Sequence, residues 1–371
     1  MPYPNHAPVV ICGAGVIGAA VAYYLSLRGV PVTLIERSAV ACAASGKAGG
    51  FLALDWCDGS PLAPLARTSF QLHADLAQAL GVDYGYRRLT TLAVAAGAHG
   101  VQRPDTMPEA LAWLDSQGVP TRVLGTPATT AQVHPAQFTH ALLHAAQARG
   151  AQLRMGCVEG IDVSAGKVRG VQVDGTLLPT EQVVIAMGPW SGCAAQWLPL
   201  PPVWGLKGHS ITLKPTTPIP AQALFVQYIT DTGEHLEPEV YPRPDGEVYL
   251  CGFSEQAALP ESPELVQPRP EAGPFLQHIA ATLSSSLAGL TPERVQACYR
   301  PVTDDGLPLL GPVPEVAGAY IATGHSCWGI LNAPASGLAM AELIVDGRAR
   351  SVDLTPFEPQ RAALRGQGKP V

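Results

Sequence analysis

The sequence predicts an α/β protein in which a nucleotide-binding domain with a parallel sheet is combined with a sheet-rich second domain of α+β character. Two observations lead to this expectation. Residues 9–36 read as strand, glycine-rich turn, helix, strand and acid in that order, and residues 203–256 consist mostly of strand-like runs. The chain has 371 residues, of which 47% are hydrophobic and 14% charged, so it can bury a core large enough for two domains.

The N-terminal segment carries the most specific local pattern. An apolar strand at 9–12 enters a turn whose glycines have the spacing G-x-G-x-x-G, and a helix follows. In a Rossmann-type unit the first glycine allows the tight turn, the second lets the backbone approach a pyrophosphate, and the third lets the helix pack on the strand. The start of the helix adds free N–H groups and a positive dipole end. The expected nucleotide contacts are Gly13, Gly15, Val16, Ile17 and Gly18.

The second predicted strand, at 32–35, is followed by an acidic residue, as expected at this position of a dinucleotide-binding unit. Glu36 lies 18 residues after Gly18, and its carboxylate can accept hydrogen bonds from the ribose hydroxyls. A membrane span is the alternative, because residues 7–27 contain no charged side chain. The glycines in its first half and the return to a strand after Gly29 argue against a span. The segment also lacks the charged start and cleavage site of a signal peptide, so we expect a cytoplasmic protein with no membrane span.

Composition excludes several classes of function. The net charge of −7 and the lack of a basic cluster argue against nucleic-acid binding. The eight cysteines show neither a C-x-x-C pair nor the spacing of a metal site, which is typical of free thiols in a reducing compartment. We therefore expect a small-molecule partner and no metal.

Helix and strand signals continue along the chain. The predicted helices span 60–80, 108–117, 135–150, 275–288 and 334–345, the last one ended by Gly347. The predicted strands form a three-stranded meander within 151–187 that turns at Asp174 and Gly175, a mostly strand-like stretch at 203–256, and three strands before the last helix. Residues 258–274, rich in proline and glutamate, indicate a surface loop.

The order of these elements is discontinuous, because the nucleotide-binding pieces bracket two insertions. We predict a nucleotide-binding domain of residues 1–80, 136–200 and 296–350, a substrate domain of residues 81–135 and 201–295, and a polar tail at 351–371.

Four local patterns together resemble the FAD-dependent D-amino-acid oxidase family, particularly its glycine oxidase and sarcosine oxidase branch. The resemblance covers about residues 8–348. The patterns are the glycine fingerprint, ACAASGKAGGFLA at 41–53, VVIAMGPWS at 183–191, and CYRPVTDDGLPLLG at 298–311 followed by ATGHSCWGILNAPASG at 322–337. The resemblance implies a Rossmann-type FAD-binding domain.

The resemblance also implies which residues contact FAD. Ser45 and its neighbours would contact the phosphates, and Gly49 and Gly50 would run beside the flavin. Backbone N–H groups before the last helix would face the flavin, where a helix N-terminus stabilises the charge of its reduced form. The further expected contacts are Arg37, Gly46, Lys47, Ala48, Val158, Ala186, Gly188, Trp190, Gly324, His325, Gly329 and Ile330. Cys298 resembles the cysteine that tethers FAD in monomeric sarcosine oxidases, but inert packing is the stronger expectation, so we predict non-covalent FAD.

Arg300 is the main candidate for substrate recognition. It precedes a proline on a predicted strand with apolar neighbours, where an always-charged guanidinium needs an anionic partner. That partner is either an internal carboxylate, Asp304 or Asp305, or the substrate carboxylate that the resemblance implies. Glycine oxidases typically carry a second arginine where this chain has Cys327, followed by Trp328. We therefore expect a less cationic, more apolar pocket that suits an alkyl group on the substrate nitrogen or Cα.

Further candidates surround this arginine. Strand alternation puts Glu239, Tyr241 and Arg243 on one face, where Glu239 could attract the substrate ammonium and Tyr241 could share the carboxylate; a solvated sheet edge is the alternative. Lys47 and His209 are candidate cationic neighbours of flavin N5 or of dioxygen, with an ordinary salt bridge and a satisfied histidine as the alternatives.

The resemblance implies FAD-dependent oxidation of the C–N bond of a glycine-type or N-substituted amino acid. Hydride would pass from Cα to flavin N5, water would hydrolyse the imine to an oxo acid such as glyoxylate plus an amine, and dioxygen would yield H2O2. One alternative is a dehydrogenase that uses another electron acceptor. A nicotinamide-dependent dehydrogenase is disfavoured by the segments 41–53 and 322–337, and a non-catalytic flavoprotein assembly factor is disfavoured by Arg300.

Overall fold

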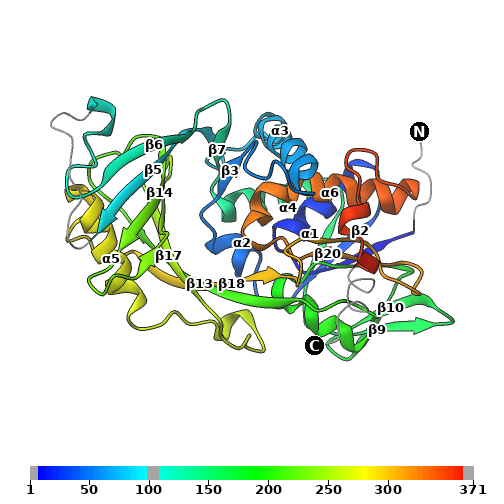
Figure 1. The fold of residues 1–371 in the computed structure, drawn as a ribbon. Coiled ribbons are helices and arrows are strands. Elements are labelled where there is room, and N and C mark those ends of the chain that lie inside the picture. The colour runs from blue at the N-terminus through cyan, green and yellow to red at the C-terminus, as the bar shows by residue number, and fades with distance from the viewer. Residues whose placement is uncertain (1–6, 98–107, 362–371) are drawn as a thin grey trace.

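The computed structural model describes residues 7–97 and 108–361, and it confirms the α/β fold class. Figure 1 shows an elongated molecule in which one half holds a helix-covered parallel sheet and the other half holds a larger, mostly antiparallel sheet. The chain passes between the two halves several times, so each half is assembled from segments that are distant in the sequence.

The helix-covered half is built on a six-stranded sheet. Its spatial order is β19 (Leu309–Pro312), β20 (Ala319–Thr323), β12 (Gln182–Ile185), β1 (Val9–Cys12), β2 (Val32–Glu36) and β8 (Gln152–Met155). Neighbouring strands are parallel except for β19 and β20. The central strands are continuous apolar runs because both of their faces are buried, as is usual for parallel sheets.

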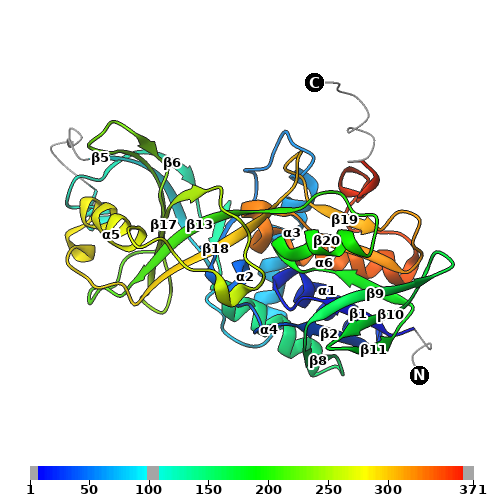
Figure 2. The ribbon, with the colours of Figure 1, turned by 90° about the horizontal axis from the view of Figure 1, so that it is seen from below.

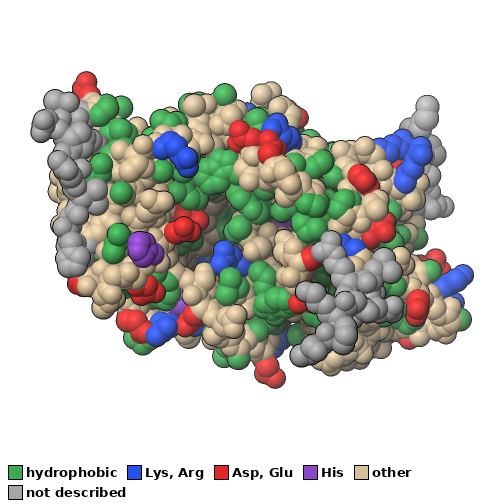
Figure 3. Space-filling model, viewed as in Figure 1, with side chains coloured by type: hydrophobic (Ala, Val, Ile, Leu, Met, Phe, Trp, Pro, Cys, Tyr) green, Lys and Arg blue, Asp and Glu red, His purple; other side chains and the backbone are tan. Residues whose placement is uncertain are grey.

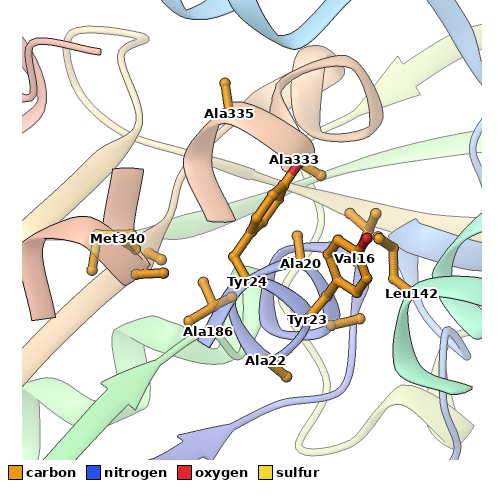
Figure 4. Close-up of a cluster of buried hydrophobic side chains, with 14 of the residues drawn as sticks. Val16, Ala20, Ala22, Tyr23, Tyr24, Leu142, Ala186, Ala333, Ala335 and Met340 are labelled. Carbon is orange, nitrogen blue, oxygen red and sulfur yellow. The ribbon is translucent and has the colours of Figure 1, made fainter. Parts of the chain in front are cut away.

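Four helices lie on this half. α1 (Val16–Leu27) packs against α4 (Pro135–Gln147) and α6 (Gly329–Asp346), and α3 (Ala63–Ala79) packs against α6. Small residues let α1 and α6 approach closely, because a Cβ atom at Gly337 would lie only 2.6 Å from the backbone carbonyl carbon of Ala20. Figure 4 shows part of this buried cluster, with Tyr24 of α1 pointing toward Ala333 of α6.

The other half is an eight-stranded sheet. Its spatial order is β18 (Arg294–Val302), β13 (Trp204–Leu213), β17 (Val248–Glu255), β16 (Glu239–Pro242), β14 (Gln222–Ile229), β5 (Thr90–Gly97) and β6 (Val119–Gly125), with β15 (His235–Leu236) paired to β14. α5 (Ala272–Leu283) packs against β13 and β17 (Figure 2). Because β18 belongs to this sheet, we favour placing residues 296–302 with the substrate domain; the division into two domains stays a proposal.

Two small sheets and several short helical turns complete the described chain. The sheets are β9 (Val158–Ser164), β10 (Lys167–Val173) with β11 (Thr176–Pro179), and β3 (Phe51–Ala53), β7 (Thr130–Gln132) with β4 (Arg87–Arg88). The shortest helix is α2 (Ala44–Lys47), and the 3-10 turns are Glu109–Leu111, Gly188–Gln196, Pro263–Leu265, Ser285–Leu287, Ser326–Trp328 and Thr355–Phe357.

The predicted meander within 151–187 was partly wrong. β8 is the edge of the parallel sheet and β12 pairs with β1, so neither belongs to the meander. The meander consists of β9, β10 and β11, and its last turn is at Asp174 and Gly175 as predicted, with φ values of +49° and +72°. The apolar run Val183–Ile185 was the available signal, because a strand that is buried on both faces is continuously apolar.

Three other predictions need correction. The predicted helix at 108–117 is only a 3-10 turn at Glu109–Leu111. Asp115, beyond this turn, accepts hydrogen bonds from the backbone N–H and hydroxyl of Ser285. The last helix begins at Gly329 and continues through Pro334. The expected polar tail is packed as far as it is described, since Phe357 is 1% exposed; residues 362–371 lie outside the described residues.

Among the described helices, one stretch is long and apolar enough to cross a membrane. It comprises α6 and the 3-10 turn before it, Ser326–Asp346, and 67% of its most apolar window is buried inside the protein.

The close contact of α1 and α6 generates a stability prediction. Gly337→Ala should lower the free energy of unfolding by about 1–3 kcal/mol, because its new Cβ would press on the backbone of Ala20 and force the helices apart. Gly160→Ala is the matched control, since its Cβ would meet Gln172 at an ordinary 3.6 Å; we expect a change within about 1 kcal/mol. Denaturant unfolding of both variants checks this. Equal stability of Gly337→Ala and the unchanged protein would contradict the packing argument.

Candidate functional site

A cavity of about 1070 Å³ lies where the two large sheets meet. Its walls come from the β1–α1 turn, the segment around α2, the end of β12, the strands β13, β16, β17 and β18, and the start of α6. Figure 3 shows the molecular surface hollowed near its middle, between the two halves of the fold. The cavity is therefore shared between the six-stranded and the eight-stranded sheet.

One end of the cavity is formed by the predicted glycine fingerprint. Gly13, with φ +107°, and Gly15 line the cavity with Val16 and Ile17, whereas Gly18 does not. Gly18 instead lets α1 approach the turn, because a Cβ there would lie 2.0 Å from the carbonyl oxygen of Gly13. This matches the role that the third glycine of such a motif has.

Glu36 lies beside this turn, at the end of β2. One carboxylate oxygen, Oε2, accepts the N–H of Ala14 at 2.9 Å, and the other, Oε1, accepts the N–H of Ser38 at 3.0 Å. The carboxylate is thereby fixed where it lines the cavity. Carboxylate oxygens can accept further hydrogen bonds, which leaves capacity for ribose hydroxyls.

The segment around α2 forms the adjoining wall. Ser45 accepts the N–H of Val16 at 2.9 Å, and it lines the cavity together with Ala48 and Gly49. A Cβ at Gly49 would lie 2.3 Å from the ring of Tyr241, so only glycine fits between the ring and the cavity. Three predicted contacts of this segment, Gly46, Lys47 and Gly50, shape the wall without lining the cavity.

The remaining predicted cofactor contacts also converge on the cavity, with one exception. Those that line it are Arg37, Val158, Ala186, Gly188, Trp190, His325, Gly329 and Ile330; Gly324 does not. The Nε2 atom of His325 lies 3.0 Å from the hydroxyl of Ser336, and burial lowers the pKa of His325 to about 3. This histidine is therefore neutral at physiological pH.

These walls suit a flavin dinucleotide. One end of the cavity is formed by a helix N-terminus, by glycines and by the fixed carboxylate of Glu36. The start of α6 lies along the same cavity. The fingerprint and Glu36 would hold the adenosine and pyrophosphate, and Gly49, Gly329 and Ile330 would lie beside the flavin ring.

Arg300 enters the cavity from β18. Its Nη2 donates to the hydroxyl of Ser254 at 2.8 Å, and its Nε is buried without a partner. Within the described part of the chain no carboxylate forms an ion pair with Arg300. Asp305, one of the two internal partners considered from the sequence, pairs with Arg361 at 3.1 Å. The guanidinium thus keeps donors available toward the cavity.

Glu239 lies on β16 and lines the same cavity. Its Oε2 accepts the hydroxyl of Tyr241 at 2.5 Å and lies 3.7 Å from the Sγ of Cys251. Burial raises the pKa of Glu239, and these two donors and the charge of Arg300 partly oppose the rise. Tyr241 itself does not line the cavity; its hydroxyl is committed to Glu239, not free for a carboxylate.

Arg243, predicted on the face of Glu239, lies in the hairpin beyond the cavity lining. It forms an ion pair with Glu247 and donates to the carbonyl of Ala48 at 3.1 Å.

The two predicted cationic neighbours are placed differently from expectation. Lys47 donates to the backbone carbonyl of Ala297 at 3.1 Å, outside the main cavity. His209 lines the cavity, but burial lowers its pKa, so it is mainly neutral at pH 7. Its ring stacks on Phe253 with centroids 4.5 Å apart, and its Nε2 lies 3.5 Å from Glu255. The lowered pKa disfavours the cationic role considered for His209, because desolvation outweighs the nearby carboxylate.

Two cysteines singled out from the sequence, Cys298 and Cys327, line the cavity. Cys298 lies opposite Gly208 on β13, and burial raises its pKa. Cys327 lines the cavity, and burial raises its pKa as well. Trp328 does not line the cavity; its ring lies edge-on to Trp56 with centroids 6.5 Å apart, so it is a packing residue.

Sequence reasoning missed Ser254, Cys251 and Tyr249, which line the cavity on β17. Strand pairing brings Cys251 opposite Glu239 and Tyr249 opposite Tyr241. Extending the side-chain alternation of the predicted hairpin to its second strand would have identified Cys251 and Tyr249. Ser254 lies beyond a register shift between β13 and β17, which alternation does not predict.

Comparisons with known proteins agree with this geometry. Residues 8–343 match the FAD dependent oxidoreductase family, DAO. A Schizosaccharomyces pombe protein named only as an oxidoreductase is 30% identical over 96% of this chain and 98% of its own length. A glycine oxidase of Geobacillus kaustophilus is 30% identical over 95% of this chain and 96% of its own length. A solved structure of glycine oxidase from Geobacillus kaustophilus has a TM-score of 0.81 and 25% identity, covering 96% of this chain and 99% of the other.

The family match covers most of the sequence, the relatives align over nearly their whole length, and the cavity offers the glycine-lined wall and fixed carboxylate of a dinucleotide site. The chain therefore belongs to the DAO family of FAD-dependent oxidoreductases and is an enzyme related to glycine oxidases.

Proposed function

We propose that the enzyme oxidises the C–N bond of a glycine-type or N-substituted amino acid whose carboxylate binds Arg300. The observation that carries this proposal is a cavity-lining guanidinium that has a buried, unpartnered Nε and, among the described residues, no ion pair. Arg300 is partly exposed to the cavity, and its buried Nε still lacks an acceptor. A planar guanidinium matches a carboxylate with two parallel hydrogen bonds. A substrate carboxylate supplies the missing anion.

Glu239 is proposed to receive the amino group of the same substrate. Its donors, Tyr241 and Cys251, both lie at Oε2, and no hydrogen bond from a described residue reaches Oε1. Oε1 can therefore accept a hydrogen bond from a substrate ammonium and take its proton, which leaves the neutral amine that the oxidation requires. Because burial raises the pKa of Glu239, this carboxylate is a better base than an exposed one.

Bound FAD supplies the hydride acceptor for this oxidation and passes the electrons on, in our proposal to dioxygen with release of H2O2. Arg300 and Glu239 orient the substrate by its two charged ends, so that only its carbon centre is free to approach the cofactor. Water then hydrolyses the product imine to an oxo acid and an amine.

FAD is proposed to be bound without a covalent link. The reactive form of a cysteine is its thiolate, and burial raises the pKa of Cys298, so this residue stays a protonated and poor nucleophile.

Arg300→Lys should lower kcat/KM by at least about thirtyfold while FAD content is unchanged, because lysine offers a point charge in place of a planar fork. The same change at Arg294, an exposed position on the same strand outside the cavity lining, is the control and should leave kcat/KM unchanged. Steady-state assays of oxygen consumption and H2O2 release measure the loss of kcat/KM. Repeating them with an artificial dye as electron acceptor shows whether the enzyme reduces dioxygen or needs another acceptor. An Arg300→Lys enzyme with full kcat/KM would make the arginine structural.

Substrate preference should follow from the neutral Cys327. With one arginine in place of two, apolar substituents should gain about 0.8 kcal/mol per buried methylene, so an N-alkylglycine or another apolar-substituted amino acid should exceed glycine in kcat/KM at least about tenfold. Kinetics with glycine and N-methyl-, N-ethyl- and longer N-alkylglycines test this, and Cys327→Arg should shift the preference back toward glycine. Free glycine as the best substrate of the series would refute the pocket argument.

Denaturation by heat or acid should release yellow FAD into the supernatant, because no covalent bond holds it. Absorbance of supernatant and precipitate after centrifugation gives the answer. A tether at Cys298 would give a different result: yellow colour would stay in the precipitate of the unchanged protein and would move to the supernatant of the Cys298→Ala variant.

A further inference from the structure

Helix α6 contains a proline close to the cavity. Pro334 is the sixth residue of α6, and it has no N–H to donate to the carbonyl of Ile330 four residues earlier. Its ring also crowds that carbonyl and disturbs the regular geometry of the neighbouring backbone groups. The Ile330 carbonyl therefore lacks the helical hydrogen bond that a residue with an N–H at position 334 would supply.

Helix α3 supplies partners for these backbone groups. The Nε2 of His73 lies 3.0 Å from the carbonyl oxygen of Ile330 and 3.2 Å from that of Leu331. The hydroxyl oxygen of Ser69 accepts the N–H of Ala335 at 3.1 Å. Both side chains are completely buried, and their four-residue spacing puts them on one face of α3.

The tautomer of His73 follows from its partners. Two carbonyl oxygens can only accept, so Nε2 must carry the hydrogen and donate to both. Burial lowers the pKa of His73 to about 4, so the ring is neutral at physiological pH and donates through this single N–H. Nδ1 has no partner among the described residues.

The turn that His73 holds belongs to the cofactor site. Ile330 and Gly329 both line the cavity, as does His325 just before the helix. Ile330 thus presents its side chain to the cavity while its carbonyl is fixed from behind by α3.

We propose that Ser69 and His73 are positioning residues that replace the helical hydrogen bonds lost at Pro334 and thereby hold the first turn of α6 in the geometry that FAD binds. They act on the cofactor through α6, without touching it. Removing the His73 donor leaves the Ile330 carbonyl buried and unpaired, so the turn relaxes and must be reordered when FAD binds.

The proposal is tested with a double-mutant cycle between His73 and Pro334. His73→Leu in the otherwise unchanged protein should raise the Kd for FAD by about tenfold or more, measured by titrating apoprotein prepared from the holoenzyme and following flavin fluorescence. Pro334→Ala restores the missing N–H, so the Ile330 carbonyl regains its helical partner. In the Pro334→Ala background the same His73→Leu change should raise the Kd by no more than about threefold.

A general loss of stability is separated from positioning by a control. Thr139, on α4, is also completely buried, and its hydroxyl donates to the carbonyl of Pro135 in its own helix at 2.9 Å. Thr139→Val should leave the Kd for FAD unchanged even if it lowers Tm, and its effect should not depend on Pro334.

Two results would overturn the proposal: a lower Tm of His73→Leu with an unchanged Kd for FAD, or the same rise in Kd in both backgrounds. If His73→Leu does not fold, the cycle is repeated with Ser69→Ala in place of His73→Leu, because the Ser69 hydroxyl accepts the N–H of Ala335. The same changes in the Kd for FAD then decide the outcome. FAD affinity is read without any substrate, so failure of the proposed amino-acid oxidation does not affect the outcome.

Discussion

The pairing of β13 with β18 is the constraint on which the site depends. The two strands are hydrogen-bonded from Trp204 and Val302 at one end to Thr212 and Arg294 at the other. Because side chains alternate along β18, this one ladder points both Cys298 and Arg300 at the cavity from the eight-stranded sheet. The next strand, β17, adds Ser254 as the partner of Arg300 and Cys251 as a partner of Glu239. The charged groups are therefore fixed by strand register and not by flexible loops.

The sequence predicted the local units well, and for a physical reason. Strand β1, helix α1, strand β2 and Glu36 follow one another along the chain, so turn geometry and hydrophobic periodicity contain the information needed to place them. The same holds for helix α4, which begins at a proline as predicted. The roles of Arg300 and Cys327 were expected from the family resemblance. Glu239 was a candidate from strand alternation, with a solvated sheet edge as the alternative, and a propensity argument alone would not have brought the three together.

The parts that could not be predicted depend on contacts between distant segments. Continuation of α6 through Pro334 depends on two side chains of α3 that lie more than 250 residues away in the sequence. The lowered pKa of His209 depends on its burial in the fold, which a charge pattern does not reveal. Likewise, the strand at 182–185 looked like part of a meander until its partner, β1, was known. Local sequence indicates whether a segment forms a helix or a strand. Tertiary packing determines which element it pairs with and the protonation state of its side chains.

The thiols of the cavity have a consequence for the durability of the enzyme. Cys251 and Cys298 line it, and burial raises the pKa of each. Peroxide oxidises a cysteine through its thiolate, so thiols that stay protonated react slowly. A site that releases peroxide, as proposed, would otherwise convert such residues stepwise to sulfenic and sulfinic acids. Desolvation of Cys251 and Cys298 would therefore slow the oxidation of these two thiols by the peroxide of the proposed reaction.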